Sequence, residues 1–197
     1  MKAAGRLLAL VILATGLGHA QSPAAGRTDH PPRFISSASL SGIPLVRQGY
    51  NQCGPASLQM ILAYWGLGMD QRVIGTLTKP NPRAYMGVDA VAQFASSVGL
   101  ASVTVRGASL NVIRALVAQG IPVLSLSYFN TPGAVPHWRV ISGFDDRQRI
   151  VLAHDPLAGY VAIRYDDFEA LRSGLGNVIA ALYPSGYTRR AQLAVRR

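Results

Sequence analysis

The sequence contains only one cysteine, Cys53, so it cannot form an internal disulfide bond. Proteins that fold in oxidising compartments usually pair their cysteines, so a lone thiol in such a protein requires an explanation. It can form an intermolecular bridge, lie buried as an inert core residue, or act as a reactive group. The stretch RQGYNQCGPASLQMILAYWG, Arg47 to Gly66, holds this cysteine and is where the three alternatives must be weighed.

Long apolar runs are also absent, except at the N-terminus. A basic start with Lys2 and Arg6 precedes the apolar run Leu7 to Leu17, and small residues then lead to a plausible cut before Gln21. This pattern is typical of a cleavable secretory signal and is too short for a comfortable membrane span. We expect residues 1–20 to be a signal peptide and the mature protein to be secreted or periplasmic, without a stable membrane span.

Acidic residues are scarce: nine stand against 19 basic ones, and the net charge is +10. Such a charge favours acidic partners or anionic surfaces. The arginines are scattered, however, apart from a small group near the C-terminus, and no basic stripe is interleaved with aromatic residues. We therefore expect a solvated basic surface and no nucleic-acid partner.

Motifs for metals and nucleotides are missing as well. The sequence has no CxxC pair and no P-loop. Cys53 together with His137 and His154 would supply too few ligands, at unhelpful spacings, for a metal site. We expect no metal and no cofactor.

The composition is that of a globular protein, with 49% hydrophobic and 14% charged residues. Residues 21–40 are rich in proline, serine, alanine and glycine, so we predict a flexible leader segment there. Residues 41–184 have the length and patterning of one domain with its own core. Residues 185–197 are predicted to form a basic, mobile C-terminal tail.

Hydrophobic periodicity predicts mainly helices in the first half of this domain and mainly strands in the second. Helices are expected at residues 56–65, 70–77, 88–98, 110–118 and 167–172, and strands at 101–105, 121–129, 138–144, 149–154, 160–165 and 178–183. Because helices come first and mostly antiparallel strands follow, we predict an α+β fold with one layer of helices on one sheet.

The position of Cys53 at the start of a predicted helix favours a reactive thiol. Unpaired N–H groups and the positive end of the helix dipole both stabilise a thiolate there, and this lowers the thiol pKa below its usual ~8.5. Pro55 suits the first helical turn, and the small Gly54 keeps the approach to sulfur open. A buried, inert cysteine is the competing interpretation.

A thiolate nucleophile needs a base and a group that orients the base. His137 opens one predicted strand, Asp155 ends the next, and both are equidistant from residue 146 in the intervening turn. In a hairpin folded there, the two side chains would face each other across the ladder. His154 would point to the opposite face, which makes it the weaker base candidate. An ordinary surface pair at a strand end is the alternative.

These segments resemble the C39 and C39-like cysteine peptidases. QCGPASLQMIL is similar to the nucleophile segment of that family, and HWRVISGFDD followed by IVLAHDP is similar to its second segment, in which a histidine starts a strand and an aspartate precedes a proline. YDDFEALR is similar to the closing helix of the family, and the resemblance covers roughly Ile43 to Tyr183. It implies a papain-like fold in the 41–184 domain.

The resemblance also implies roles for particular residues. Cys53 would be the nucleophile, His137 the general base and acid, and Asp155 the orienting group. Gln48 would donate to the oxyanion hole, although it lies one residue closer to the cysteine than is common in the family. Gln52, directly before Cys53, is the other amide to consider.

The function that follows is a stand-alone secreted cysteine peptidase, which acts on a peptide or protein substrate through a thioester acyl-enzyme. Trimming of double-glycine leader peptides is not carried over, because the chain has no exporter segment and carries its own signal. Two alternatives stay open: an inactive peptide-binding module on the same fold, and an amide hydrolase or acyl transferase.

Overall fold

The computed structural model describes residues 35–196 of the chain. The expected signal peptide and most of the expected leader therefore lie outside the described residues. Within residues 35–196, no helix combines the length and apolar character needed to cross a bilayer.

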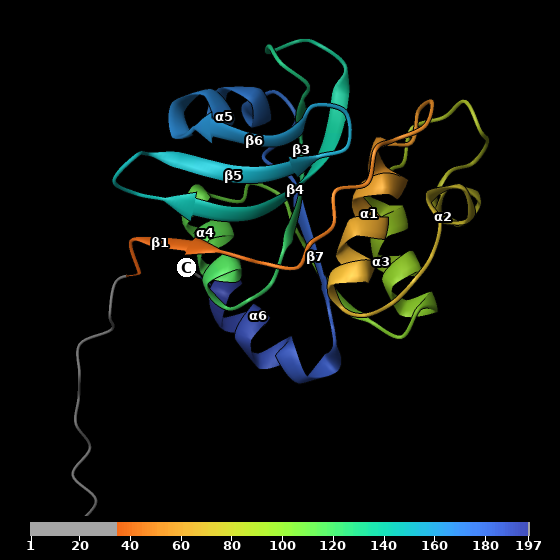
Figure 1. The fold of residues 1–197 in the computed structure, drawn as a ribbon, viewed down its shortest axis with the longest axis horizontal. Coiled ribbons are helices and arrows are strands. Elements are labelled where there is room, and N and C mark those ends of the chain that lie inside the picture. Colours follow the sequence, from red (N-terminus) through yellow and green to blue (C-terminus); the bar gives the residue numbers. More distant parts are fainter. Residues whose placement is uncertain (1–34, 197) are drawn as a thin grey trace, which may run out of the picture. The chain divides into compact units, whose positions relative to one another are not determined.

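A single antiparallel sheet forms the centre of the domain (Figure 1). Its strands are β1 Ser37–Ser39, β2 Ala101–Val105, β3 Val123–Tyr128, β4 Pro136–Asp145, β5 Ile150–Asp155, β6 Gly159–Arg164 and β7 Ile179–Tyr183. The order across the sheet is β2-β7-β3-β4-β5-β6, and β1 pairs with β4 outside this path. The α+β prediction is confirmed.

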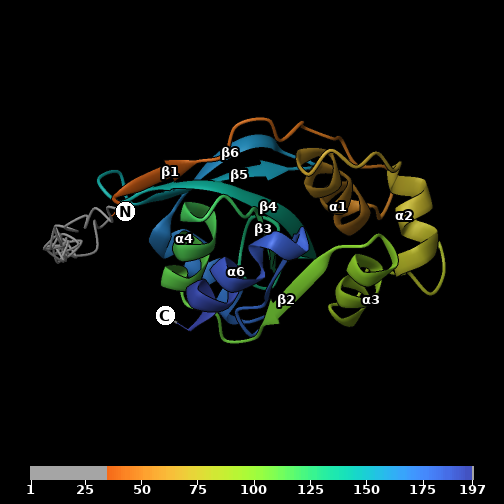
Figure 2. The same ribbon diagram turned by 90° about the horizontal axis from the view of Figure 1, so that it is seen from below.

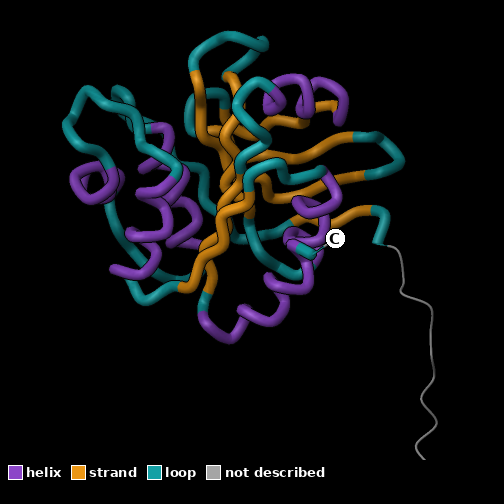
Figure 3. The backbone as a smooth tube through the Cα atoms, turned by 180° about the vertical axis from the view of Figure 1, so that it is seen from behind, coloured by secondary structure: helices purple, strands orange, loops and turns teal. Residues whose placement is uncertain are grey.

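Helices cover both faces of this sheet. They are α1 Cys53–Tyr64, α2 Gln71–Thr78, α3 Asp89–Ser97, α4 Leu110–Ala118, α5 Tyr165–Ser173 and α6 Thr188–Val195, with a short 3-10 turn at Ser185–Tyr187. α1, α2 and α3 group together, and α4 and α6 lie apart from them (Figures 1 and 2). The strands run between these two sets of helices (Figure 3).

The two faces of β7 show why helices are needed on both sides. Ile179 and Ala181 pack into the core with α4, α5 and α6, while Ala180 and Leu182 pack into a second core with α1 and α3. Successive side chains of a strand point to opposite faces, so an all-apolar strand must be covered twice. The prediction of one helical layer was therefore wrong: the helices form two.

Most predicted elements lie within two or three residues of the observed ones, and β2 and α4 match the prediction. The N-caps explain the clear starts of two helices. Asp70 accepts a hydrogen bond from the N–H of Arg72 before α2, and Ser109 accepts one from the N–H of Val112 before α4. Such caps satisfy donors that a helix start otherwise leaves unpaired.

Two segments expected to be loose are ordered. Ser37–Ser39, at the end of the expected leader, pairs with β4. The expected mobile tail instead forms α6, whose Ala191 and Ala194 are buried. The ring of Tyr187 also packs edge-on against Trp65, with 4.9 Å between the ring centroids. The prediction of a mobile tail was wrong. Although this segment is basic overall, Ala191 and Ala194 form a narrow apolar stripe on one face of α6.

The β4–β5 hairpin contains a bulge that the sequence did not reveal. Ile141 lies opposite Ala153, but Gly143 lies opposite Leu152, so Ser142 is an extra residue on β4. Because side chains alternate between faces, one extra residue changes which residues share a face. The bulge therefore sets the register of the strand ends that carry His137 and Asp155.

The packing of α6 predicts a stability difference between two positions of the same helix. Ala191→Leu is expected to destabilise the fold by roughly 1–3 kcal/mol, because the added volume has no room in a packed core. Gln192→Leu, at an exposed position, is expected to change stability by less than about 0.5 kcal/mol. Denaturant unfolding measures both, and equal effects would contradict the docking of α6.

Candidate active site

Cys53 is the first residue of α1 and is buried against β4. The side chain of Ser57, one turn further along α1, donates a hydrogen bond to the carbonyl of Trp138 at 3.2 Å. This bond holds the start of α1 beside the strand that carries His137.

Gly54 allows the wall next to the nucleophile to pack closely. A Cβ atom at this position would lie 2.6 Å from the end of the Met86 side chain and 2.8 Å from its Cβ atom. The indole N–H of Trp138 also donates to the carbonyl of Met86 at 3.1 Å. The glycine predicted to keep sulfur accessible thus also makes room for Met86.

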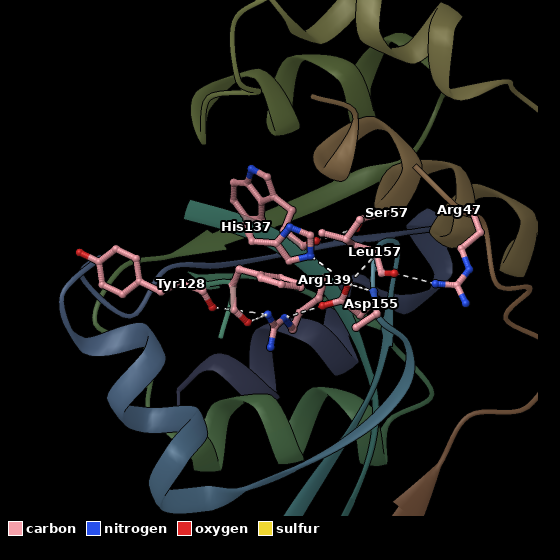
Figure 4. Close-up of polar contacts among 10 residues, drawn as sticks. Arg47, Ser57, Tyr128, His137, Arg139, Asp155 and Leu157 are labelled. Atoms are coloured by element: carbon pink, nitrogen blue, oxygen red, sulfur yellow. Dashed lines mark hydrogen bonds and ion pairs between the residues drawn. The ribbon is translucent and has the colours of Figure 1, made fainter. Parts of the chain in front are cut away.

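The structure brings His137 and Asp155 together. The Nε2 atom of His137 lies 3.0 Å from Oδ1 of Asp155 (Figure 4). The same carboxylate oxygen accepts hydrogen bonds from the N–H groups of Leu157 at 2.8 Å and Ala158 at 2.9 Å. Both side chains are buried, with 4% of His137 and 1% of Asp155 exposed. The predicted contact is present, and the alternative of a surface pair is wrong.

The predicted register of this contact was wrong by two residues. Val140 lies opposite His154, so the same register places Arg139, not His137, opposite Asp155. His137 reaches the carboxylate diagonally. Without the extra residue Ser142, Asp155 would lie opposite Val140. The side chain of Val140 is on the face opposite to that of Arg139 and His137, so Asp155 would point away from His137. The bulge is what puts Asp155 on the face of His137.

The alternation of side chains along a strand predicts that Arg139 shares a face with His137, and its residue type favours a surface position over a place in the site. The structure places it in the site. It is 2% exposed, and its Nε atom lies 3.3 Å from Oδ2 of Asp155. Its terminal nitrogen donates to the carbonyl of Phe129 at 2.7 Å. The ring of Phe129 in turn packs edge-on against His137, at 5.1 Å between centroids. Arg139 thus links the carboxylate to the residue that covers the imidazole.

The electrostatics favour an ion pair between the thiol and the imidazole. Burial alone raises the pKa of Cys53, but hydrogen bonds from His137 and the Trp138 N–H favour the thiolate, and the pKa is lowered overall. Burial alone lowers the pKa of His137, but Asp155 and Cys53 favour the imidazolium, and the pKa is raised overall. Opposite shifts in adjacent groups are typical of functional sites.

Asp155 completes this set of charges. Burial alone raises the pKa of its carboxyl group, yet the hydrogen bond and charge of His137, together with backbone N–H donors and Arg139, lower it overall. The carboxylate is therefore negative over the pH range in which the thiol and imidazole exchange a proton. It holds one ring nitrogen of His137 and leaves the other for the sulfur.

A cavity of about 340 Å³ opens onto Cys53 and His137. Its walls include Gln48, Tyr85 and Leu157, and none of the lining residues is aspartate, glutamate, lysine or arginine. A cavity of this size accommodates one side chain of a bound peptide.

Gln48 lies in this cavity, whereas Gln52 does not. The backbone of Gln48 donates to the carbonyl of Pro156 at 2.9 Å. The side chain of Gln71 bonds to both of its chain neighbours, the carbonyl of Arg47 and the N–H of Gly49, each at 2.8 Å. The amide of Gln52 lies instead against Gly75 of α2. The structure thus places Gln48, not Gln52, in the wall of the cavity that Cys53 also lines.

His154 is separate from this arrangement. Its Nδ1 atom lies 3.0 Å from the hydroxyl oxygen of Ser142, and its ring packs edge-on against Tyr160. Burial lowers its pKa. It therefore supports the bulge and does not face sulfur. Across residues 35–196, no three His, Cys, Asp or Glu side chains gather closely enough to bind a metal.

The model of the Peptidase_C39-like family matches residues 40–174 of this chain. The match covers more than half of the sequence, so the chain belongs to the Peptidase_C39-like family. A comparison with curated proteins gives no match.

Several solved structures share the fold. A protein from Bacillus anthracis described as a C39-like peptidase has a TM-score of 0.60 at 19% identity, over 75% of this chain and 98% of that one. The peptidase domain of Streptococcus ComA, a bifunctional ABC transporter involved in a quorum-sensing pathway, has a TM-score of 0.60 at 15% identity. The match covers 73% of this chain and 99% of that one. A double-glycine motif protease from an AMS/PCAT transporter, solved in complex with the leader peptide, has a TM-score of 0.56 at 20% identity. The match covers 76% of this chain and 99% of that one.

These comparisons confirm the predicted family and the papain-like fold class. At such identities, the structural similarity concerns the fold alone. The family supports a function of the cysteine-peptidase type, and the geometry above shows how this chain's own residues are arranged for it.

The coupling of the three charges predicts how the reactivity of the thiol depends on pH. Asp155→Asn removes the charge that favours the imidazolium, and the imidazolium in turn favours the thiolate. The midpoint of Cys53 alkylation by iodoacetamide is therefore expected to move to higher pH, by roughly one unit or more. Asp166→Asn, an exposed aspartate paired with Arg149, is the control and should leave the profile unchanged. Overlapping profiles for wild type and Asp155→Asn would contradict this coupling.

Proposed function

We propose that this protein is a cysteine peptidase that hydrolyses peptide bonds through a thioester acyl-enzyme. Cys53 is the nucleophile, His137 the general base and acid, and Asp155 the orienting group. The observation that supports this most strongly is the arrangement of three buried side chains: the one thiol of the chain lies at the start of α1, His137 favours its thiolate form, and a carboxylate holds the Nε2 of His137.

The proposed reaction has two halves. The thiolate of Cys53 attacks the carbonyl carbon of the scissile peptide bond, and the electron pair moves to the oxygen. When the tetrahedral intermediate collapses, the C–N bond breaks and the imidazolium of His137 gives its proton to the leaving amine. A water molecule then loses a proton to His137 and attacks the thioester, which releases the acid and the thiol.

The negative oxygen of each intermediate needs donors. The backbone N–H of Cys53 is available because the first N–H groups of a helix have no partner within the helix. The amide of Gln48 is the proposed second donor, since it lines the cavity and its backbone is fixed on both sides. Donors held in place before the reaction cost no reorganisation during it.

The cavity also supports a substrate class. Because its lining contains apolar residues such as Val135 and Leu157 but no acid, lysine or arginine, it favours an uncharged, apolar side chain beside the scissile bond. A peptide or protein substrate is consistent with the leader peptide bound to the similar transporter protease. We place the mature enzyme outside the cytoplasm because of the N-terminal signal in its sequence.

The proposed nucleophile and base predict the result of covalent labelling. A peptidyl electrophile is expected to label the wild type, whereas Cys53→Ala and His137→Ala should abolish labelling or slow it by at least about 10². Intact-protein mass spectrometry measures the adduct. His154→Gln serves as the matched histidine control and should still be labelled, because the glutamine amide can keep the bond to Ser142 and His154 does not contact the sulfur. Equal labelling of wild type and Cys53→Ala would rule out this mechanism.

The oxyanion assignment predicts a difference between two neighbouring glutamines. Gln48→Ala is expected to lower the rate of Cys53 acylation by p-nitrophenyl acetate by roughly 10²–10³, since one donor to the developing oxyanion is lost. Gln52→Ala is expected to have a much smaller effect, because its amide lies against Gly75. The burst of p-nitrophenolate reports the rate. The reverse order of effects would exchange the two roles.

A further inference from the structure

The sequence contains only two lysines, Lys2 and Lys79. All the other residues of the Lys and Arg set are arginine. Lys79 follows α2 directly and is only 8% exposed. Lysine side chains are almost never buried to this degree unless they have partners. The presence of a lysine at position 79 and its low exposure both indicate that its side chain has a specific structural role.

The partners of Lys79 are two backbone carbonyls on different loops. Its Nζ atom donates to the carbonyl of Asn51 at 3.0 Å and to that of Pro82 at 2.9 Å. A third bond joins the same two loops directly, from the side-chain amide of Asn51 to the carbonyl of Arg83 at 2.9 Å. Lys79 and Asn51 therefore clamp the segment before Cys53 to the loop after α2.

The first of these loops leads into the proposed oxyanion site. Asn51 adopts the left-handed conformation, with φ of 55°, which is uncommon for residues other than glycine, although asparagine adopts it more readily than most. The carbonyl of Asn51 belongs to the peptide unit just before the one that holds the N–H of Cys53. Gln48 lies three residues before Asn51 in the chain. A conformation of this kind persists only when surrounding contacts hold it. The ammonium of Lys79 supplies such a contact at the turn itself.

The second loop forms a wall of the cavity. Tyr85 lines the cavity beside Cys53. Met86 packs on Gly54, and its carbonyl is bound by Trp138. The loop after α2 is thus fixed by Trp138 of β4 at Met86 and by Lys79 at Pro82. Both ends of this cavity wall are held in place next to Cys53.

We infer that Lys79 is a positioning residue, which uses its ammonium to hold the Asn51 turn and the cavity wall so that the N–H of Cys53 and the amide of Gln48 converge on the oxyanion. This inference rests on the proposed function. It differs from a general stabilising role, because it concerns one step: the stabilisation of an oxygen anion, not the formation of the thiolate.

The chemistry of lysine suits this place. An ammonium is a compact charge with three donors that can point to converging carbonyls, whereas a guanidinium presents a planar fork. Burial lowers the pKa of Lys79, and the negative sulfur of Cys53 opposes this shift. Lys79 itself does not line the cavity, so it acts on the site through the two loops that it joins.

The test compares two reactions of the same sulfur. Acylation by p-nitrophenyl acetate passes through an oxyanion, whereas alkylation by iodoacetamide is a displacement that forms none. In Lys79→Met, acylation is expected to fall roughly ten- to hundredfold, because misplaced donors lose their effect, while alkylation falls less than about threefold. Arg83→Met removes an exposed positive charge from the same loop and should leave both rates within about twofold.

The outcomes separate this role from others. Unchanged acylation in Lys79→Met, or an equal fall in both reactions, would overturn the positioning role. If Lys79→Met does not fold, the comparison is made with Lys79→Gln, which removes the charge and shortens the side chain, and the same selective loss of acylation is expected. A wild type that is alkylated but never acylated would instead overturn the proposed function, and this inference with it.

Discussion

The carboxylate of Asp155 receives three hydrogen bonds on one oxygen and faces the Arg139 guanidinium with the other. An uncompensated charge buried in a protein costs on the order of several kcal/mol, so this carboxylate depends on all of these partners. In return it keeps the His137 ring oriented and favours its protonated form, which favours the thiolate of Cys53. The charges of the candidate site thus depend on one buried anion.

The sheet places this anion by a detail of its register. Ser142 is an extra residue on β4, and it is held by the ring of His154. Since one extra residue exchanges the two faces of a strand, the bulge decides that Asp155 shares a face with His137. The loops around Cys53 have a comparable dependence, because the left-handed turn at Asn51 is held by contacts from the loop that follows α2. The geometry of the candidate site is thus maintained by residues other than the three that carry its charges.

Local patterns predicted much of the fold, and their failures have physical causes. α4 and β2 were predictable, because periodicity and a cap such as Ser109 act within a few residues. The short strand Ser37–Ser39 was not, since its order comes from pairing with β4 and not from its own residues. α6 was missed because burial of Ala191 and Ala194 depends on neighbours far away in the sequence. Arg139 was considered a surface residue because nothing in its local sequence showed that the sheet would be covered on both faces.

The sequence by itself determined which chemistry was available. It has one thiol at a helix start, a histidine that opens a strand, an aspartate at the end of the next strand and a glutamine upstream of the cysteine, and these are properties of residue type and local periodicity. Only the tertiary structure decided which of them meet. The diagonal contact of His137 with Asp155, the position of Gln48 in the cavity wall, and the burial of Arg139 and of Lys79 follow from strand register and loop packing. These depend on long-range contacts, to which the local pattern of the sequence is insensitive.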